Sequence, residues 1–221
     1  MGKLVNYISS LHTSTSRLYI DRMNDNKIEC MIKAKKYGRD YWDGDRRYGY
    51  GGYKYIPGRW KSVAEKLIQQ YNLDDKSNVL DVGCGKGFLL YEIKKLIAKI
   101  NIVGFDKSPY AIENSKEEIK KELFVHSAEN KFPYENNFFD LVISINTLHN
   151  LKIFDLKSSL EEISRVGKNG YICVESYRNE EELFNLECWA LTCESFYQPD
   201  EWEWVFNTFK YKGDYEFIFF T

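Results

Sequence analysis

Cysteine, proline and histidine are scarce in this sequence, with five, four and three copies among 221 residues. The cysteines are odd in number and none stands in a Cys-x-x-Cys pair, which argues against a disulfide framework and against a zinc site. They are Cys30, Cys84, Cys173, Cys188 and Cys193. We therefore expect ordinary thiols and no metal centre.

Neither sign of charge is in excess. The 31 lysines and arginines are balanced by 33 aspartates and glutamates, which gives a formal net charge of −2. A protein that binds nucleic acid through its phosphates usually has a basic excess or a basic stripe. Nucleic acid is therefore not the expected partner.

Long apolar runs are also missing. The longest, such as residues 141–145, are far shorter than the roughly 20 residues of a membrane span. The amino terminus shows no apolar segment before a small-residue cleavage site, and Asn6 stands where a myristoylation signal has Ser or Thr. We predict a cytoplasmic chain that does not bind a membrane.

Aromatic residues, in contrast, are abundant and unevenly spread. There are 17 tyrosines, 14 phenylalanines and 5 tryptophans, and eight of these residues, with six glycines, fall within residues 37–60. Thirteen more fall within residues 184–221. With 43% hydrophobic and 29% charged residues the chain is typical of one folded domain. We expect a helical, aromatic N-terminal cap over residues 1–62 and the main domain over residues 63–221.

Between the aromatic zones, apolar residues alternate between the period of a buried strand and that of a helix. We expect strands at residues 78–82, 101–105, 123–126, 139–145, 171–175 and 215–220. Helices are expected at residues 17–23, 27–36, 63–71, 88–100, 110–121 and 199–209, around 160–166 and after 177, with Ser108 as the N-cap before Pro109. Strands that alternate with helices predict an α/β fold, a mostly parallel sheet with helices on both faces.

A glycine loop follows the first strand of this sheet. It reads Asp81-Val82-Gly83-Cys84-Gly85-Lys86-Gly87, at the place where an open parallel sheet binds its ligand. Glycines there let the chain turn tightly and a ligand lie directly on the backbone. Phe88 occupies the position where a dinucleotide fingerprint has its last glycine, which disfavours a nicotinamide cofactor.

Two carboxylates indicate which ligand this loop binds. Asp106 ends the second strand, where an acidic side chain accepts hydrogen bonds from both hydroxyls of a ribose. Asp81 ends the first strand, where a carboxylate repels a pyrophosphate but suits a ligand with a positive amino group.

On these residues the sequence resembles the class I S-adenosylmethionine-dependent methyltransferases. The matching segments are Val79-Leu80-Asp81-Val82-Gly83-Cys84-Gly85-Lys86-Gly87, Val103-Gly104-Phe105-Asp106-Lys107-Ser108, Ser127-Ala128-Glu129 ahead of Phe132-Pro133, and Phe139-Asp140-Leu141-Val142-Ile143-Ser144. The resemblance implies a Rossmann-like sheet of seven strands with an antiparallel closing strand. We expect that strand to be truncated, because only about twelve residues follow the helix at 199–209.

The resemblance also implies a set of residues that bind S-adenosyl-L-methionine. Gly83 and Gly85 pass under the cofactor, Asp106 holds the ribose, and the loop from Ser127 to Glu129 borders the adenine. The adenine amino group is contacted by Ser127, Glu129 or backbone. The complete expected set is Asp81, Gly83, Cys84, Gly85, Gly87, Asp106, Lys107, Ser127, Ala128, Glu129 and Asn146.

Candidate residues for the methyl acceptor lie after the fourth and fifth strands. His149 is a general base by its ordinary pKa, or alternatively it packs structurally at the start of a helix. Asn146 orients either the acceptor or the cofactor. Glu175 is a second candidate for orienting or deprotonating the acceptor, and Tyr50 is a third candidate catalytic residue.

The Gly/Tyr-rich segment at residues 43–55 is interpreted as a lid over the cofactor and acceptor. The alternative is a surface loop whose tyrosines pack on the core. The second aromatic cluster, around residues 189–209, is interpreted as a wall or packing support of the same pocket. Arginines there and elsewhere are candidates for binding an anionic group of the substrate, because guanidinium pairs bidentately with carboxylate or phosphate. These are Arg46, Arg47, Arg59 and Arg178.

Together these patterns predict an enzyme that methylates a small polar metabolite, such as a sugar or nucleotide-sugar hydroxyl or a phosphorylated compound. The substrate is small and can be anionic. The alternatives are a methyltransferase for protein or RNA, a non-catalytic S-adenosylmethionine-binding protein, and a nicotinamide-dependent oxidoreductase, against which Asp81 and Phe88 argue.

Overall fold

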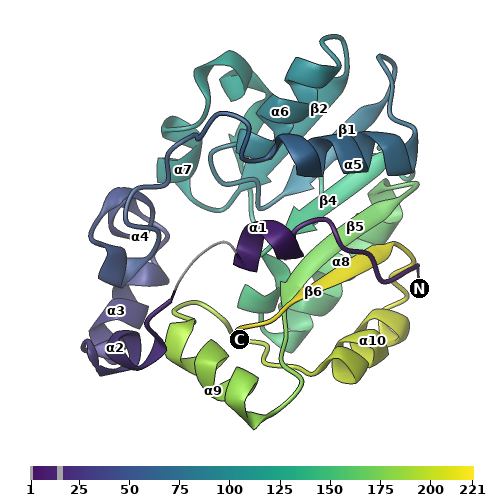
Figure 1. The fold of residues 1–221 in the computed structure, drawn as a ribbon. Coiled ribbons are helices and arrows are strands. Elements are labelled where there is room, and N and C mark those ends of the chain that lie inside the picture. Colours follow the sequence, from purple (N-terminus) through teal and green to yellow (C-terminus); the bar gives the residue numbers. More distant parts are fainter. Residues whose placement is uncertain (1, 14–16) are drawn as a thin grey trace.

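The computed structural model describes residues 2–13 and 17–221. Its centre is a sheet of six strands in the order β3-β2-β1-β4-β5-β6, and every neighbouring pair is parallel (Figure 1). The strands are β1 (Asn78–Val82), β2 (Asn101–Asp106), β3 (Leu123–Val125), β4 (Leu141–Ile145), β5 (Gly170–Glu175) and β6 (Asp214–Ile218). The α/β fold predicted from the sequence is confirmed.

Helices cover both faces of the sheet, because side chains alternate along each strand. On β4, Leu141 and Ile143 pack into a core with α5 (Lys61–Tyr71) and α6 (Phe88–Leu96). Val142 between them points to the opposite face, into a core with α8 (Ile153–Val166) and α10 (Pro199–Thr208). The two cores hold the strands rigidly and leave the carboxyl ends of β1, β2, β4 and β5 free to carry the site.

The last strand corrects one expectation, since β6 is parallel rather than antiparallel. It pairs with β5 from Tyr171 opposite Asp214 to Glu175 opposite Ile218. Two helices, α9 (Glu180–Trp189) and α10, carry the chain back to the end of the sheet from which β5 starts. A strand that follows such a crossover enters in the same direction as its predecessor. Within the described residues the sheet has no antiparallel strand.

The N-terminal segment is attached to this same edge. Leu4 forms a parallel bridge with Tyr215. Further along, the buried carboxylate of Glu216 accepts hydrogen bonds from the backbone N–H groups of Tyr7, Ile8 and Ser9 at 2.6–3.1 Å, ahead of α1 (Ser9–Thr13). The first residues of the chain are therefore anchored to the edge of the sheet, and Ile8, Leu11 and His12 line the same cavity as the glycine loop.

The later part of the N-terminal segment forms a cap at the carboxyl ends of the strands, at the left of Figure 1. It consists of α2 (Tyr19–Asn24), α3 (Lys27–Ala34), α4 (Arg39–Asp43) and η1 (Arg46–Tyr48). Lys27 Nζ anchors the cap by donating to backbone carbonyls at the end of α9, at 3.0 Å for Glu187 and 2.7 Å for Cys188. A cation at a helix C-terminus is favourable because the carbonyls there have no partner within the helix.

Several local signals are confirmed and others are shorter than expected. The Ser108 hydroxyl accepts from Ala111 N at 3.0 Å and caps α7 (Pro109–Glu113). The helix expected at residues 110–121 is interrupted and continues as η2 (Glu117–Glu122). β4 starts two residues later than expected, and Phe139 forms only an isolated bridge with Gly167.

The helices within residues 2–13 and 17–221 are all short. The longest, α8, has 14 residues, and none is both long and apolar enough to cross a membrane. The compartment of the protein stays a prediction.

Candidate active site

A cavity of about 500 Å³ lies between the carboxyl ends of the strands and the cap. It brings together most of the residues expected from the sequence. Those that line it are Asp81, Gly83, Cys84, Gly85, Asp106, Lys107, Ala128, Glu129 and Asn146 from the cofactor set, and Tyr50, His149 and Glu175 from the catalytic set. The roles of these residues remain proposals, but their common location agrees with the expectation.

Gly87 and Ser127 do not line the cavity. Gly87 has a φ of 74° and precedes α6, where an added Cβ would lie 2.8 Å from Leu123 Cδ1. Its role is to let the helix pack closely on the sheet. Ser127 uses its backbone carbonyl to accept from Asn130 N at 3.1 Å. Of the two side chains considered for the adenine, only Glu129 reaches the cavity.

The glycine loop has the backbone conformation that the sequence analysis required. Gly83 has a φ of 79°, and an added Cβ would stand 2.1 Å from Thr147 Oγ1. Gly85 has a φ of 55°, and its Cβ would approach the Trp42 ring to 3.0 Å. Side chains at these two positions would be strained and would fill the floor of the cavity.

The two carboxylates of the cofactor end are buried, and that of Asp106 is held by backbone hydrogen bonds. Asp106 accepts from Gly85 N at 3.0 Å and from Ser108 N at 2.8 Å, which holds its carboxylate at the end of β2. Asp81 lies nearby, and burial together with the charge of Asp106 raises its pKa to about 7. A cationic group bound against Asp81 would restore its ionised form.

Among the described residues, four buried side-chain atoms in the cavity wall have no hydrogen-bond partner. They are His126 Nε2, Glu129 Oε2, Asn146 Oδ1 and Asn150 Oδ1. Asn146 also has a φ of 53°, an uncommon conformation for a residue with a side chain. Buried unpaired atoms are costly unless a ligand satisfies them. The wall therefore fits a polar ligand such as S-adenosylmethionine, which carries amino, carboxylate, hydroxyl and adenine groups.

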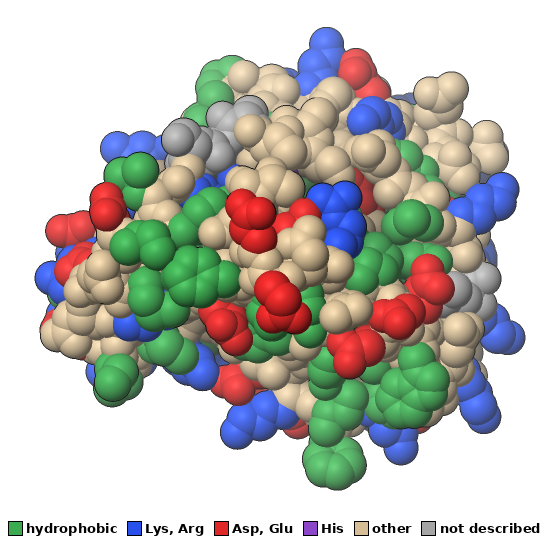
Figure 2. Space-filling view, turned by 60° about the horizontal axis from the view of Figure 1, so that its bottom comes forward, with side chains coloured by type: hydrophobic (Ala, Val, Ile, Leu, Met, Phe, Trp, Pro, Cys, Tyr) green, Lys and Arg blue, Asp and Glu red, His purple; other side chains and the backbone are tan. Residues whose placement is uncertain are grey.

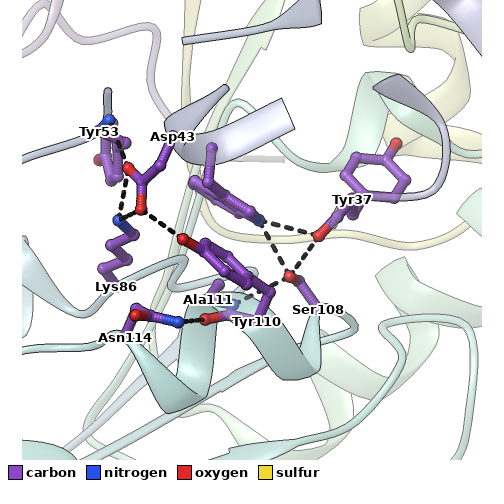
Figure 3. Close-up of polar contacts among 9 residues, drawn as sticks. Tyr37, Asp43, Tyr53, Lys86, Ser108, Tyr110, Ala111 and Asn114 are labelled. Carbon is purple, nitrogen blue, oxygen red and sulfur yellow. Dashed lines mark hydrogen bonds and ion pairs between the residues drawn. The ribbon is translucent and has the colours of Figure 1, made fainter. Parts of the chain in front are cut away.

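The cap closes over the glycine loop through two sets of polar contacts (Figure 3). Asp43 binds Lys86 Nζ at 2.7 Å and accepts from Tyr110 Oη at 2.9 Å. The indole nitrogen of Trp42 donates to Ser108 Oγ at 2.9 Å. Since Lys86 is in the loop and Ser108 follows β2, these bonds fasten the cap to the two segments expected to hold the cofactor.

Stacked aromatic rings form the inner surface of the cap. Trp42 and Tyr50 stack with ring centroids 5.3 Å apart and planes 11° from parallel, and Tyr53 stacks on Phe88 at the start of α6. All four residues line the cavity. This arrangement supports the interpretation as a lid, because both tyrosines line the cavity, although Tyr50 remains 40% exposed.

His149 and Glu175 face each other at the other end of the cavity. Glu175 N donates to His149 Nδ1 at 3.2 Å, and Glu175 Oε2 lies 3.4 Å from His149 Nε2. Burial lowers the pKa of His149 to about 3 and raises that of Glu175 to about 7, with the Arg17 charge acting to lower the latter. The imidazole is therefore neutral, and the lone pair on Nδ1 is already occupied.

The arginines divide into two groups. Arg46 and Arg59 line the cavity as expected. Arg47 instead pairs with Asp25 at 2.7 Å, and Arg178 binds Glu182 on α9. The expectation that these two bind the substrate is not supported by their positions.

Sequence reasoning missed several residues of the wall. Arg17, Arg22 and Trp42 line the cavity, and so does His126, just beyond β3. The aromatic enrichment of residues 37–60 was the available signal for Trp42. Trp189, from the second aromatic cluster, lines the cavity as expected. No pattern in the sequence marked the two arginines.

Comparison with known families agrees with this geometry. Residues 73–215 match the family model of a methyltransferase domain, which is well over half of the chain. The chain belongs to this methyltransferase family. The expected family and its cofactor, S-adenosylmethionine, are thereby confirmed.

Relatives of the methyltransferase carry different activities. It is 32% identical over 110 residues to the mitochondrial arginine-hydroxylase NDUFAF5 of Mus musculus, covering 49% of this chain and 31% of that protein. It is 28% identical over 137 residues to the malonyl-[acyl-carrier protein] O-methyltransferase of Hahella chejuensis, covering 61% of this chain and 48% of that protein. The chain thus spans less than half the length of either relative.

Solved structures support the fold of the methyltransferase. A Haloferax volcanii complex that contains the Trm112 methyltransferase activator matches 84% of this chain and 76% of its own, with a TM-score of 0.54 and 19% identity. A geranyl diphosphate C-methyltransferase from Streptomyces coelicolor, bound to S-adenosyl-L-homocysteine, matches 66% of this chain and 58% of its own. The TM-score is 0.54 and the identity is 12%.

Proposed function

We propose that the protein transfers a methyl group from S-adenosylmethionine to a hydroxyl or amino group of a small polar metabolite, with Glu175 as the proton acceptor. The observation that carries the proposal is the burial of Glu175 in the same cavity as the glycine loop, with a pKa raised to about 7. A base is most effective when its pKa is close to the working pH.

His149 is assigned to position Glu175 rather than to take the proton. Its Nδ1 accepts from Glu175 N, so its hydrogen resides on Nε2, which faces the Glu175 carboxylate at 3.4 Å. A ring in this tautomer has no free lone pair to offer an acceptor. It holds the backbone and the side chain of Glu175 at once.

The cofactor is assigned to the glycine-loop end of the cavity. The backbone of Gly83 and Gly85 would lie against it, Asp106 would hold the ribose, and Asp81 would face the amino group. S-adenosylmethionine supplies an electrophilic methyl group on a sulfonium. Tyr50 lines the same cavity and stacks on Trp42. Its ring presents a face to cationic charge.

The size and roof of the cavity support a small acceptor. A volume of about 500 Å³ is in the range of a site for one compact ligand, and the cofactor and acceptor must share it. The cap covers this volume with aromatic rings. These features suit a sugar or nucleotide-sugar hydroxyl or a phosphorylated compound better than a folded macromolecule.

The surface gives no support to an RNA acceptor on the face that carries α9 and α10. Figure 2 shows acidic side chains in the middle of this face and most of its lysines and arginines near the rim. Both helices start with carboxylates, among them Glu180, Glu181, Asp200 and Glu201. Acidic residues repel a phosphate backbone.

Label transfer from methyl-labelled S-adenosylmethionine tests this function. The purified protein is incubated with a cell extract that has been separated into metabolites, RNA and protein. We expect the label in the metabolite fraction with wild-type protein and little label with Glu175→Gln. Label in RNA or protein would favour the alternative acceptors, and S-adenosylhomocysteine binding without any transfer would favour a non-catalytic binding protein.

A further inference from the structure

Three arginines surround the ring of Trp189 in the wall of the cavity, at the end assigned to the acceptor. The guanidinium carbons of Arg22, Arg46 and Arg17 lie 4.5, 4.9 and 5.3 Å from the centre of the Trp189 ring. All four residues line the cavity. Arg17 and Arg22 come from α2 and the residues just before it, Arg46 from η1 and Trp189 from the end of α9, so the fold brings together three separate pieces of chain.

The arginines are held in place by backbone carbonyls. Arg22 Nε donates to Trp189 O at 2.9 Å and its Nη1 to Arg46 O at 3.0 Å, while Arg46 Nη1 donates to Gly49 O. Carbonyl oxygens orient a guanidinium but do not neutralise it. In the described residues neither Arg22 nor Arg46 forms an ion pair with a carboxylate.

Their positive charges act against each other. Burial and the charge of Arg46 both lower the pKa of Arg22, to about 10, and Arg46 also acts to lower the pKa of Arg17. All three remain protonated at neutral pH. The carboxylate that acts on this cluster from the cavity is Glu175, through Arg17. Asp25 also acts on Arg22, but it is paired with Arg47. The three guanidinium groups together with Glu175 therefore leave a net positive charge that a bound anion would balance.

We infer that Arg17, Arg22 and Arg46, arranged around Trp189, form a subsite for an oxyanion of the methyl acceptor, a phosphate or a carboxylate. Guanidinium groups bind phosphates and carboxylates alike through paired N–H donors. Cation–π contact with the indole ring orients these donors. The inference rests on the proposed function, since it assigns the acceptor to the Glu175 end of the same cavity. The substrate is then a metabolite with an anionic group next to the hydroxyl or amine that receives the methyl group.

Anion binding to the whole protein tests this subsite without a known substrate. The probes are inorganic phosphate and acetate, compared with chloride at equal ionic strength, and the readout is the thermal unfolding midpoint. We expect one of the two oxyanions to raise the midpoint beyond chloride in the wild type. Protection by phosphate identifies a phosphorylated acceptor, and protection by acetate alone identifies a carboxylate.

Neighbouring arginines provide a matched pair of variants. Arg46→Gln keeps a donor for Gly49 O but loses the positive charge. It should lower the affinity for the oxyanion roughly ten-fold or more. Arg47→Gln changes the next residue, which pairs with Asp25 outside the cavity, and should leave the affinity unchanged. Each variant is compared with its own anion-free midpoint, and Arg46→Lys, which restores the charge, should recover part of the binding.

The outcomes separate this inference from the proposed function. If S-adenosylhomocysteine stabilises the wild type but no oxyanion protects it beyond chloride, the subsite is overturned and the proposed function stands. Equal loss of protection in Arg46→Gln and Arg47→Gln would also overturn it. If S-adenosylhomocysteine does not bind, the proposed function fails whatever the anions do.

Discussion

The backbone N–H of Glu175 donates to Nδ1 of His149 across 3.2 Å, and the carboxylate of the same Glu175 lies 3.4 Å from the other ring nitrogen. One imidazole thus contacts both the backbone and the side chain of the residue that ends β5. This pairing assigns the base to the carboxylate and the orienting role to the histidine.

The pH dependence of turnover should therefore follow Glu175. With saturating cofactor, so that Asp81 is already ionised, kcat/KM for the acceptor should rise with pH through about 7 and level off above it, because a base must be deprotonated. Glu175→Gln should remove this rise and lower kcat by roughly 100-fold or more. A rise near pH 7 that persists in Glu175→Gln would assign the base to another group.

Replacing His149 should disturb the orientation of the proposed base, Glu175, without removing its carboxylate. In His149→Ala the Glu175 carboxylate loses its orientation, so kcat should fall about 10-fold while S-adenosylhomocysteine binding is kept. His149→Gln, whose amide can both accept from Glu175 N and donate to its carboxylate, should recover part of the rate. Loss of activity in His149→Ala as complete as in Glu175→Gln would contradict the positioning role.

The bonds of Asp43 to Lys86 and Tyr110 should control closure of the cap. Asp43→Ala removes both and leaves Lys86, whose side chain is almost fully buried, without its carboxylate. We expect faster proteolysis within residues 37–60 and a weaker affinity for the cofactor. The control is Asp45→Ala. This variant loses an exposed N-cap contact to Arg47 N but keeps the bonds of Asp43 to Lys86 and Tyr110. Equal cleavage rates in the two variants would show that the bonds of Asp43 do not hold the cap closed.

The buried carboxylate of Glu216 should matter for stability rather than for chemistry. It accepts from three backbone N–H groups of the N-terminal segment and from Tyr171 Oη at 2.7 Å. Glu216→Ala leaves these donors buried without a partner, so the free energy of unfolding in denaturant should fall by about 3 kcal/mol or more. Glu216→Gln keeps two acceptor lone pairs and should cost less. An unchanged midpoint in Glu216→Ala would contradict this anchoring.

Much of the fold follows from local signals in the sequence. The strand that ends in Asp81, the glycine loop and the N-cap at Ser108 each depend on neighbouring residues only, and the structure has them where expected. The direction of β6 was not predictable in this way, since it depends on where two helices return the chain. The interruption between α7 and η2 falls at Asn114 and Ser115, whose side chains compete for backbone hydrogen bonds and disfavour a helix interior.

The candidate site was predicted well where it is local and poorly where it is assembled from distant segments. Gly85 and Asp106 were assigned from two short motifs, each at the end of a strand. Arg17, Arg22 and Trp189 meet only because the cap packs on the end of α9, over more than 160 residues of sequence. His149 lines the cavity as expected, but its tautomer depends on a hydrogen bond from a strand 26 residues away.

Calorimetric titration with S-adenosylhomocysteine tests the central claim, that this cavity is the cofactor site, most directly. The account predicts one molecule bound per wild-type chain, near-complete loss of binding in Asp106→Ala, and retention in Glu175→Gln. At 100 times the Kd, the ligand should add about 2.7 kcal/mol of stability, a rise of roughly 5–10 °C in Tm. Absence of binding to the wild type, or equal affinity in Asp106→Ala, would contradict it.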